Sequence, residues 1–259
     1  MLKSFEIADA SRNSALKMVH ASKSSHIGSS LSVIDILSVI VDGTDLKIRR
    51  ELGNELIISK GHAAAGVYSV LAHSGYLPTE LLDTYSLDGS LIGGHVTSTH
   101  VPVINLSTGS LGHGLPFSVG RALAKKRLGI EGQSFVVLSD GECDEGSNWE
   151  AAMFAGHRKL TNLIAVVDRN GFQQGSPTSK TNELDPLDKK FEAFGWEVCV
   201  VDGHNYEALL KAFTDPQTKP RVIIAQTTKG KGVDFMEGKA EWHHKVPSDE
   251  QYEQALEQV

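Results

Sequence analysis

The chain has 259 residues, 40% of them hydrophobic, and a formal net charge of −7. This apolar content is ample for the core of one large domain, so we expect residues 1–259 to form a single domain. The negative charge disfavours a surface for nucleic acid or for an anionic membrane, and no apolar run has the length of a membrane span. Because Cys143 and Cys199 lie far apart and the start lacks a signal peptide, we expect a cytoplasmic protein without a disulfide framework.

Apolar residues at helical spacing predict helices over residues 5–22 and 31–41. The turn between them carries His26 among serines and a glycine, where a histidine is usually a surface residue. The apolar run 55–59 predicts the first core strand, which ends at Gly61-His62 and leads into a helix to about residue 73. At that helix N-terminus His62 could donate a hydrogen bond to an anion, or it could simply cap or pack.

A more irregular stretch follows and contains His95. Beyond it, three glycines within residues 109–114 predict a tightly folded loop whose backbone meets a ligand. This loop precedes a further helix.

The central part of the predicted fold is a strand-helix-strand unit over residues 135–174. One apolar strand ends at Asp140, a helical segment covers about 148–159, and a second apolar strand ends just before Asn170. A parallel crossover brings both strand ends to one edge of the sheet, where ligands bind in open α/β folds. A carboxylate and an amide oxygen at that edge suit Mg²⁺ or Ca²⁺, and Gly141 lets the backbone approach a phosphate. Either motif alone could be an ordinary turn; the pair at this spacing favours a metal site.

The polar segment 174–188 is predicted to cross the mouth of this site. Apolar runs then predict a strand over 196–201, a helix over 205–214 and a last core strand over 221–226. The loop after that strand carries Lys229 and Lys231, which either bind a phosphate or are simply solvated. Further on, the chain reaches Trp242-His243-His244.

Asp140-Gly141, followed thirty residues later by Asn170, resembles the diphosphate-binding motif of thiamine diphosphate enzymes. The intervening Glu145-Gly146 and the segment 150–157 narrow the resemblance to transketolases. Ser139 stands where the family motif begins with glycine. The resemblance covers nearly the whole chain.

This resemblance implies an α/β fold, with a parallel sheet between helices, that binds thiamine diphosphate through Mg²⁺ or Ca²⁺. The implied metal ligands are Asp140, Asn170 and the carbonyl of Phe172. The implied cofactor contacts are His62, Gly109, Leu111, Gly141, Glu145, Asp168, Asn170 and His243, with Glu145 and Glu150 also at a subunit interface. The implied catalytic residues are His26, His62, His95 and His243, with His244 as the alternative to His243.

Transketolases also have a pyrimidine-binding domain, for which this sequence shows no second set of motifs. We therefore expect the N-terminal subunit of a split transketolase, a transferase that moves a two-carbon ketol unit from a ketose phosphate to an aldose phosphate. Its expected partner is a separate pyrimidine-domain chain in an α2β2 assembly. Alternatives are the α subunit of a 2-oxo acid dehydrogenase and a non-catalytic cofactor-binding partner. Departures from the family pattern in the loops near the substrate suggest an unusual sugar: Ser25, Ile27, Gly93, His113 and His244.

Overall fold

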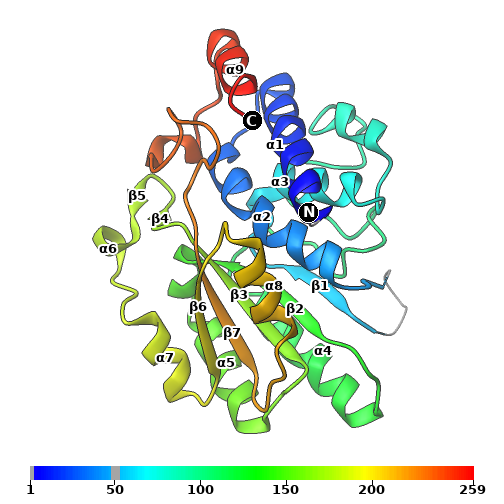
Figure 1. The fold of residues 1–259 in the computed structure, drawn as a ribbon, viewed down its shortest axis with the longest axis vertical. Coiled ribbons are helices and arrows are strands. Elements are labelled where there is room, and N and C mark those ends of the chain that lie inside the picture. The colour runs from blue at the N-terminus through cyan, green and yellow to red at the C-terminus, as the bar shows by residue number, and fades with distance from the viewer. Residues whose placement is uncertain (1–2, 48–52) are drawn as a thin grey trace.

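A parallel five-stranded sheet forms the centre of the protein (Figure 1). The computed structural model describes residues 3–47 and 53–259. The strand order is β1-β2-β3-β7-β6, and every neighbouring pair is parallel. The predicted α/β fold class is therefore confirmed. The strands are β1 (Glu55–Ile58), β2 (Ser134–Ser139), β3 (Leu163–Arg169), β6 (Glu197–Asp202) and β7 (Arg221–Gln226).

The sheet buries an apolar core on each of its faces. Successive side chains of a strand point to opposite faces, so that Phe135 and Val137 of β2 enter one core while Val136 and Leu138 enter the other. The three central strands therefore consist of near-continuous apolar runs, as expected for strands covered on both sides.

Helices from different parts of the chain cover the two faces. One core takes side chains from α1, α2, α3 and α8, and the other from α4, α5 and α7. Their bounds are α1 (Lys3–Ser22), α2 (Ile27–Gly43), α3 (Ala64–His73), α4 (Gly114–Leu128), α5 (Gly146–Arg158), α7 (Leu187–Ala193) and α8 (Tyr206–Thr214). Four short 3-10 helices lie among the described residues: η1 (Gly61–Ala63), η2 (Thr79–Thr84), η3 (Gly141–Asp144) and η4 (Ala240–His243).

Several elements of the structure were not predicted. The segment 174–188 contains part of a small antiparallel hairpin and a one-turn helix, and the chain ends in a helix that packs beside α1 (Figure 1). No helix among the described residues combines the length and the apolarity that a bilayer crossing requires. These added elements are β4 (Phe172–Gln173), β5 (Ser176–Pro177), α6 (Thr178–Thr181) and α9 (Asp249–Leu256).

Candidate functional site

The predicted site residues converge at the carboxyl ends of the central strands. A cavity of about 270 Å³ opens there. Of the residues that the sequence places in the site, Asp140 and Asp168 do not line this cavity. The predicted residues that do line it are His26, His62, His95, Gly109, Leu111, Gly141, Glu145, Asn170, Phe172 and His243. His244, the alternative to His243, lines it as well.

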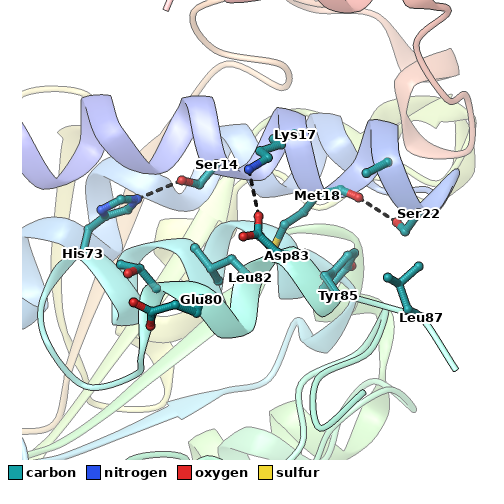
Figure 2. Close-up of a pocket in the computed structure, with 12 residues that line it drawn as sticks. Ser14, Lys17, Met18, Ser22, His73, Glu80, Leu82, Asp83, Tyr85 and Leu87 are labelled. Atoms are coloured by element: carbon teal, nitrogen blue, oxygen red, sulfur yellow. Dashed lines mark hydrogen bonds and ion pairs between the residues drawn. The ribbon is translucent and has the colours of Figure 1, made fainter. Parts of the chain in front are cut away.

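A larger cavity, of about 330 Å³, lies away from these residues, between α1, α3 and η2 (Figure 2). Four of its polar side chains are paired with each other: Ser14 Oγ lies 2.8 Å from His73 Nε2, and Lys17 Nζ donates to Asp83 Oδ1 at 2.8 Å. A ligand would have to break these contacts to use the groups. We therefore place the functional site at the smaller cavity, where the polar groups converge.

Asp140 and Asn170 are brought together by the ends of β2 and β3. Asp140 is fully buried; its Oδ1 accepts from the backbone N–H of Gly141 at 2.8 Å and its Oδ2 from that of Gly171 at 2.6 Å. Burial, together with the nearby carboxylate of Asp168, raises the pKa of Asp140 to about 6. A carboxylate in this environment gains from a bound cation. Asn170, the residue before Gly171, lines the cavity and offers a second hard oxygen donor, which accepts from the N–H of Phe172 at 3.1 Å. These residues fit a divalent metal.

Asp168 makes contacts inside the protein. Its Oδ2 forms an ion pair with the buried ammonium of Lys60 and accepts from Ser32 Oγ at 2.7 Å, while its Oδ1 accepts from Thr227. Lys60 also donates to the carbonyl of Ser29 at 3.1 Å. Because the side chains of β3 alternate, Asp168 points with Val166 toward α2. Through these contacts Asp168 links α2 to the segments that follow β1 and β7. Its contact with the thiamine stays a prediction.

Four histidines from four loops surround the cavity, with His26 at the centre. Its ring centroid lies 5.4 Å from that of His62, 5.7 Å from that of His95 and 4.9 Å from that of His243. His26 has a left-handed backbone, with φ of 73°, and its N–H donates to the carbonyl of His243 at 2.9 Å. This bond fastens the loop before α2 to the loop that contains η4.

The imidazoles of His26, His62 and His243 are neutral at neutral pH. Burial and the charge of His95 lower the pKa of His26 to about 4, and burial and the charge of Lys229 lower that of His243 to about 3. The pKa of His62 also lies well below its ordinary value, chiefly because the ring is buried. A neutral imidazole has one N–H donor and one acceptor nitrogen, so each ring can both donate to and accept from a polyol.

Lys229 is a buried cation beside the cavity. Its Nζ lies 3.2 Å from His243 Nδ1 and 3.4 Å from Ser29 Oγ, and across the described parts of the chain no carboxylate forms an ion pair with it. Burial and the charge of Lys60 lower its pKa to about 8. A buried ammonium without a counterion is complementary to an anion. Lys231, by contrast, is partly exposed and lies 3.4 Å from Glu237. Of the two open interpretations, the solvated loop fits Lys231 and the anion site fits Lys229.

Sequence reasoning assigned no role to Glu142 or Gln173. The buried carboxylate of Glu142 accepts from Ser59 and from the N–H of Gly112 at 2.9 Å, which ties the glycine loop to β1. Gln173 lines the cavity, and its buried Oε1 has no hydrogen-bond partner in the described structure. A Cβ on residue 141 would collide with the Gln173 side chain, so only glycine fits at this position. In the sequence, Glu142 looks like any acidic turn residue, so no signal could have identified it.

Comparisons with known proteins agree with this geometry. The chain is 43% identical over 240 residues to one subunit of the apulose-4-phosphate transketolase of Actinobacillus succinogenes, covering 90% of this chain and 87% of that protein. It is 38% identical over 241 residues to the 6-deoxy-6-sulfo-D-fructose transketolase subunit SqwG of a Clostridium species, covering 90% and 88%. These similarities favour a transketolase over a 2-oxo acid dehydrogenase.

Other transketolases match over a smaller share of their length. Rat transketolase is 36% identical over 260 residues, which are 98% of this chain but 41% of that protein. The solved transketolase of Campylobacter jejuni superposes with a TM-score of 0.88 at 30% identity, covering 98% of this chain and 42% of that one. The family model "Transketolase, thiamine diphosphate binding domain" matches residues 4–258. The chain therefore belongs to the transketolase family of transferases, in which it corresponds to the domain that binds thiamine diphosphate.

Proposed function

We propose that this chain is the diphosphate-binding subunit of a two-chain transketolase and forms one domain over residues 1–259. The similarity to proteins that are themselves named as transketolase subunits, over 87% and 88% of their length, supports this assignment. A pyrimidine-domain chain is the proposed partner, in an α2β2 assembly. Cys143 and Cys199 are both free, which supports a reducing cytoplasm as its location.

One observation carries the proposal: the buried ammonium of Lys229 forms no ion pair with any carboxylate of residues 3–47 or 53–259, and it lies in the same site as Asp140 and Asn170. Asp140, Asn170 and the carbonyl of Phe172 would hold the divalent metal. Lys229, His62, His243 and the N–H of Gly141 would hold the diphosphate, because hydrogen bonds from charged and backbone donors favour a phosphate. Gly109 and Leu111 would contact the thiamine rings.

When bound, the thiazolium supplies the electron sink that protein side chains lack. The residues of this chain would bind and orient the sugar around it. His26 and His95 would donate to and accept from sugar hydroxyls, and His243 would hold or release a proton at the substrate oxygen. No arginine or lysine lines the cavity among the described residues. The partner would therefore supply the cations for an anionic sugar terminus.

The relatives suggest the substrate class. Their names specify apulose 4-phosphate and 6-deoxy-6-sulfo-D-fructose, which are ketoses with a phosphate or a sulfonate at the end away from the carbonyl. We propose that this chain acts on a ketose with an anionic terminus of this kind.

The test mixes the chain with its pyrimidine-domain partner, thiamine diphosphate and Mg²⁺. Ketol transfer is measured from xylulose 5-phosphate and from a sulfonated ketose to ribose 5-phosphate. We expect transfer only in the mixture, and none with Asp140→Asn, which removes a metal-binding carboxylate. Sustained transfer by this chain alone would contradict the split assignment. Cofactor binding without transfer from either donor would contradict the proposed substrate class.

A further inference from the structure

Lys229 is the second residue of a tight turn that follows β7. The turn runs from Thr228 to Lys231 and is closed by a hydrogen bond from the N–H of Lys231 to the carbonyl of Thr228 at 3.2 Å. Gly230 has a φ of 78°, the conformation that the third residue of a type II turn adopts. Because Thr228 is the residue before Lys229, the position of Thr228 determines where the lysine side chain begins.

The side chain of His204 binds the first residue of this turn. The backbone N–H of Thr228 donates to His204 Nε2 at 2.8 Å. An imidazole nitrogen that accepts a hydrogen bond carries no proton, so the ring proton lies on Nδ1. Nδ1 lies 2.6 Å from Oδ2 of Asp35, to which it donates. Asp35 therefore fixes the tautomer of the ring that leaves Nε2 free to accept from the turn.

The ring of His204 is held from two sides. The buried carboxylate of Asp35 is itself fixed, because it also accepts from Arg12 Nη2 at 2.6 Å and from the hydroxyl of Tyr206. On the other side, the backbone N–H of His204 donates to Oδ1 of Asp202 at 2.8 Å, which orders the turn between β6 and α8. His204 thus has a fixed place between α2 and the turn that carries Lys229.

The backbone of this turn determines where the Lys229 ammonium lies. Within the described residues no carboxylate pairs with the ammonium, whose Nζ lies 3.2 Å from His243 Nδ1. A counterion therefore does not hold it in place. The end of the turn is attached to the loop before α2, because the N–H of Gly230 donates to the carbonyl of Gly28 at 3.0 Å. The start of the turn is attached through His204.

We propose that His204 is a positioning residue for the anion site at Lys229. Paired with Asp35, it fixes the turn that presents the ammonium to the diphosphate, although neither His204 nor Asp35 lines the cavity. A cation that is already in place binds an anion more tightly than one that must first be ordered. The identity of the anion rests on the proposed function, whereas the attachment of the turn to His204 does not.

Two substitutions separate the two contacts of the ring. His204→Asn keeps an amide donor near the place of Nδ1 for Asp35 but loses the acceptor for Thr228. His204→Gln places its amide oxygen near the position of Nε2 and can still accept from Thr228. Inorganic diphosphate with Mg²⁺ is titrated into the full chain by calorimetry. We expect the Kd to rise about 3- to 10-fold in His204→Asn, the effect of one lost hydrogen bond, and to stay near the wild-type value in His204→Gln.

Lys229→Met tests whether His204 acts through the ammonium. In that background His204→Asn should leave the Kd unchanged, whereas the effects of independent contacts would add. His73→Asn is the matched control, because His73 is likewise a half-buried histidine, with Nε2 2.8 Å from Ser14 Oγ in the other cavity. The control should bind diphosphate like the wild type. Additive effects, or a wild-type Kd in His204→Asn, would overturn the proposal.

Hydrogen exchange followed by NMR measures the attachment of the turn directly. The amide of Thr228 should exchange at least roughly tenfold faster in His204→Asn than in the wild type, and at the wild-type rate in His204→Gln. Equal exchange rates in all three proteins would overturn the proposal.

Circular dichroism checks that each variant is folded. Thr228→Pro removes the same hydrogen bond from the donor side, and it takes the place of His204→Asn in the titration if that variant does not fold. If the wild-type chain binds no diphosphate, the proposed function fails, while hydrogen exchange still decides whether His204 holds the turn.

Discussion

His26 shows how a single residue combines strain with function. Its left-handed backbone, with φ of 73°, costs a non-glycine residue about 1–2 kcal/mol, and sites that carry such strain tend to be functional. The conformation places the ring among His62, His95 and His243 while the N–H reaches the carbonyl of His243. The strain is therefore part of how the four rings are brought together.

We predict that His26→Gly is more stable than His26→Ala by about 1 kcal/mol, because both lose the ring but glycine relieves the backbone strain. Urea unfolding of the two variants measures this difference. Both should lose ketol transfer when assembled with the partner. Equal stabilities would show that the left-handed backbone is not strained at this position.

Lys229→Met should have opposite effects on stability and on cofactor affinity. The Lys229 ammonium is buried and forms no ion pair in the part of the chain that the structure describes, so its removal should leave the cofactor-free chain as stable or more stable. The Kd for thiamine diphosphate should rise by about 10- to 100-fold, because the lost hydrogen bond to a charged group contributes about 1.5–3 kcal/mol. Thermal unfolding and calorimetry measure the two quantities, with Lys231→Met as the partly exposed control. Equal affinities in the two variants would exclude Lys229 as a diphosphate ligand.

At the scale of elements, helices are positioned by close approaches and by buried ionic contacts. A Cβ on Gly156 of α5 would overlap the carbonyl oxygen of Phe194, so this helix lies directly against the turn before β6. On the other face, Asp35 of α2 accepts from Arg12 Nη2 at 2.6 Å, from His204 Nδ1 at 2.6 Å and from Tyr206. His204 Nε2 in turn accepts from the N–H of Thr228 at 2.8 Å, next to Lys229.

Gly156→Ala should destabilise the protein by about 1–3 kcal/mol or more, because the helix must move away from the turn to admit a methyl group. Gly120→Ala in α4 is the matched control. No atom lies within 4 Å of its added Cβ, so the better helix propensity of alanine should stabilise by up to about 1 kcal/mol. Chemical denaturation compares the two, and a neutral Gly156→Ala would contradict the packing.

Asp35→Asn should cost about 3–5 kcal/mol at neutral pH, because Arg12 would keep a largely buried charge without its anion. Burial alone would raise the pKa of Asp35, but the hydrogen bond from His204 and the charge of Arg12 hold it below the ordinary 3.8. The ion pair thus stabilises the fold above that pH, and its contribution falls as pH drops from 3.8 toward the lower folded pKa. Urea unfolding of the wild type and of Asp35→Asn should show that the difference between their free energies of unfolding narrows below pH 3.8. A difference that does not change with pH would exclude the charge of the carboxylate as its cause.

At the scale of the whole molecule, α5 presents an apolar surface beside the site. Met153 is 55% exposed and Phe154 is 37% exposed, on the helix that follows the cavity residue Glu145. Adjacent exposed apolar side chains of this kind are typical of a surface that another protein covers. The resemblance to transketolases also predicts a subunit interface at the start of the same helix, through Glu145 and Glu150, and this remains a prediction.

Met153→Glu should therefore weaken assembly with the pyrimidine-domain chain by about tenfold or more, as expected when a charge enters an apolar interface. Leu128→Glu is the control, because Leu128 is 72% exposed at the end of α4 away from the site. Sedimentation of each variant with the partner measures the affinity. Equal weakening by both substitutions would argue against α5 as the interface.

The sequence predicts what depends on local pattern. β7 has the predicted bounds 221–226, and the unit β2-α5-β3 carries Asp140 and Asn170 to one edge, because apolar runs and turn residues specify both. Helix α9 was missed although Ser248 and Gln251 form a capping box, a signal that the sequence contains. The burial of Lys229 and the ion pair of Asp168 with Lys60 depend on contacts between segments far apart in the sequence, which no local pattern encodes.

The strand order has a consequence for synthesis on the ribosome. β7 lies between β3 and β6, and in the described sheet β6 pairs with β7 alone. The nascent chain therefore exposes β6 before its neighbour has been made. The loop that contributes His243 emerges later still, although the histidine it meets, His26, is translated before any strand of this sheet. Fragments that end before residue 221 should expose an unpaired edge of β3 and aggregate, so the cell gains a functional site only after β7 and the loop that carries His243 have been made.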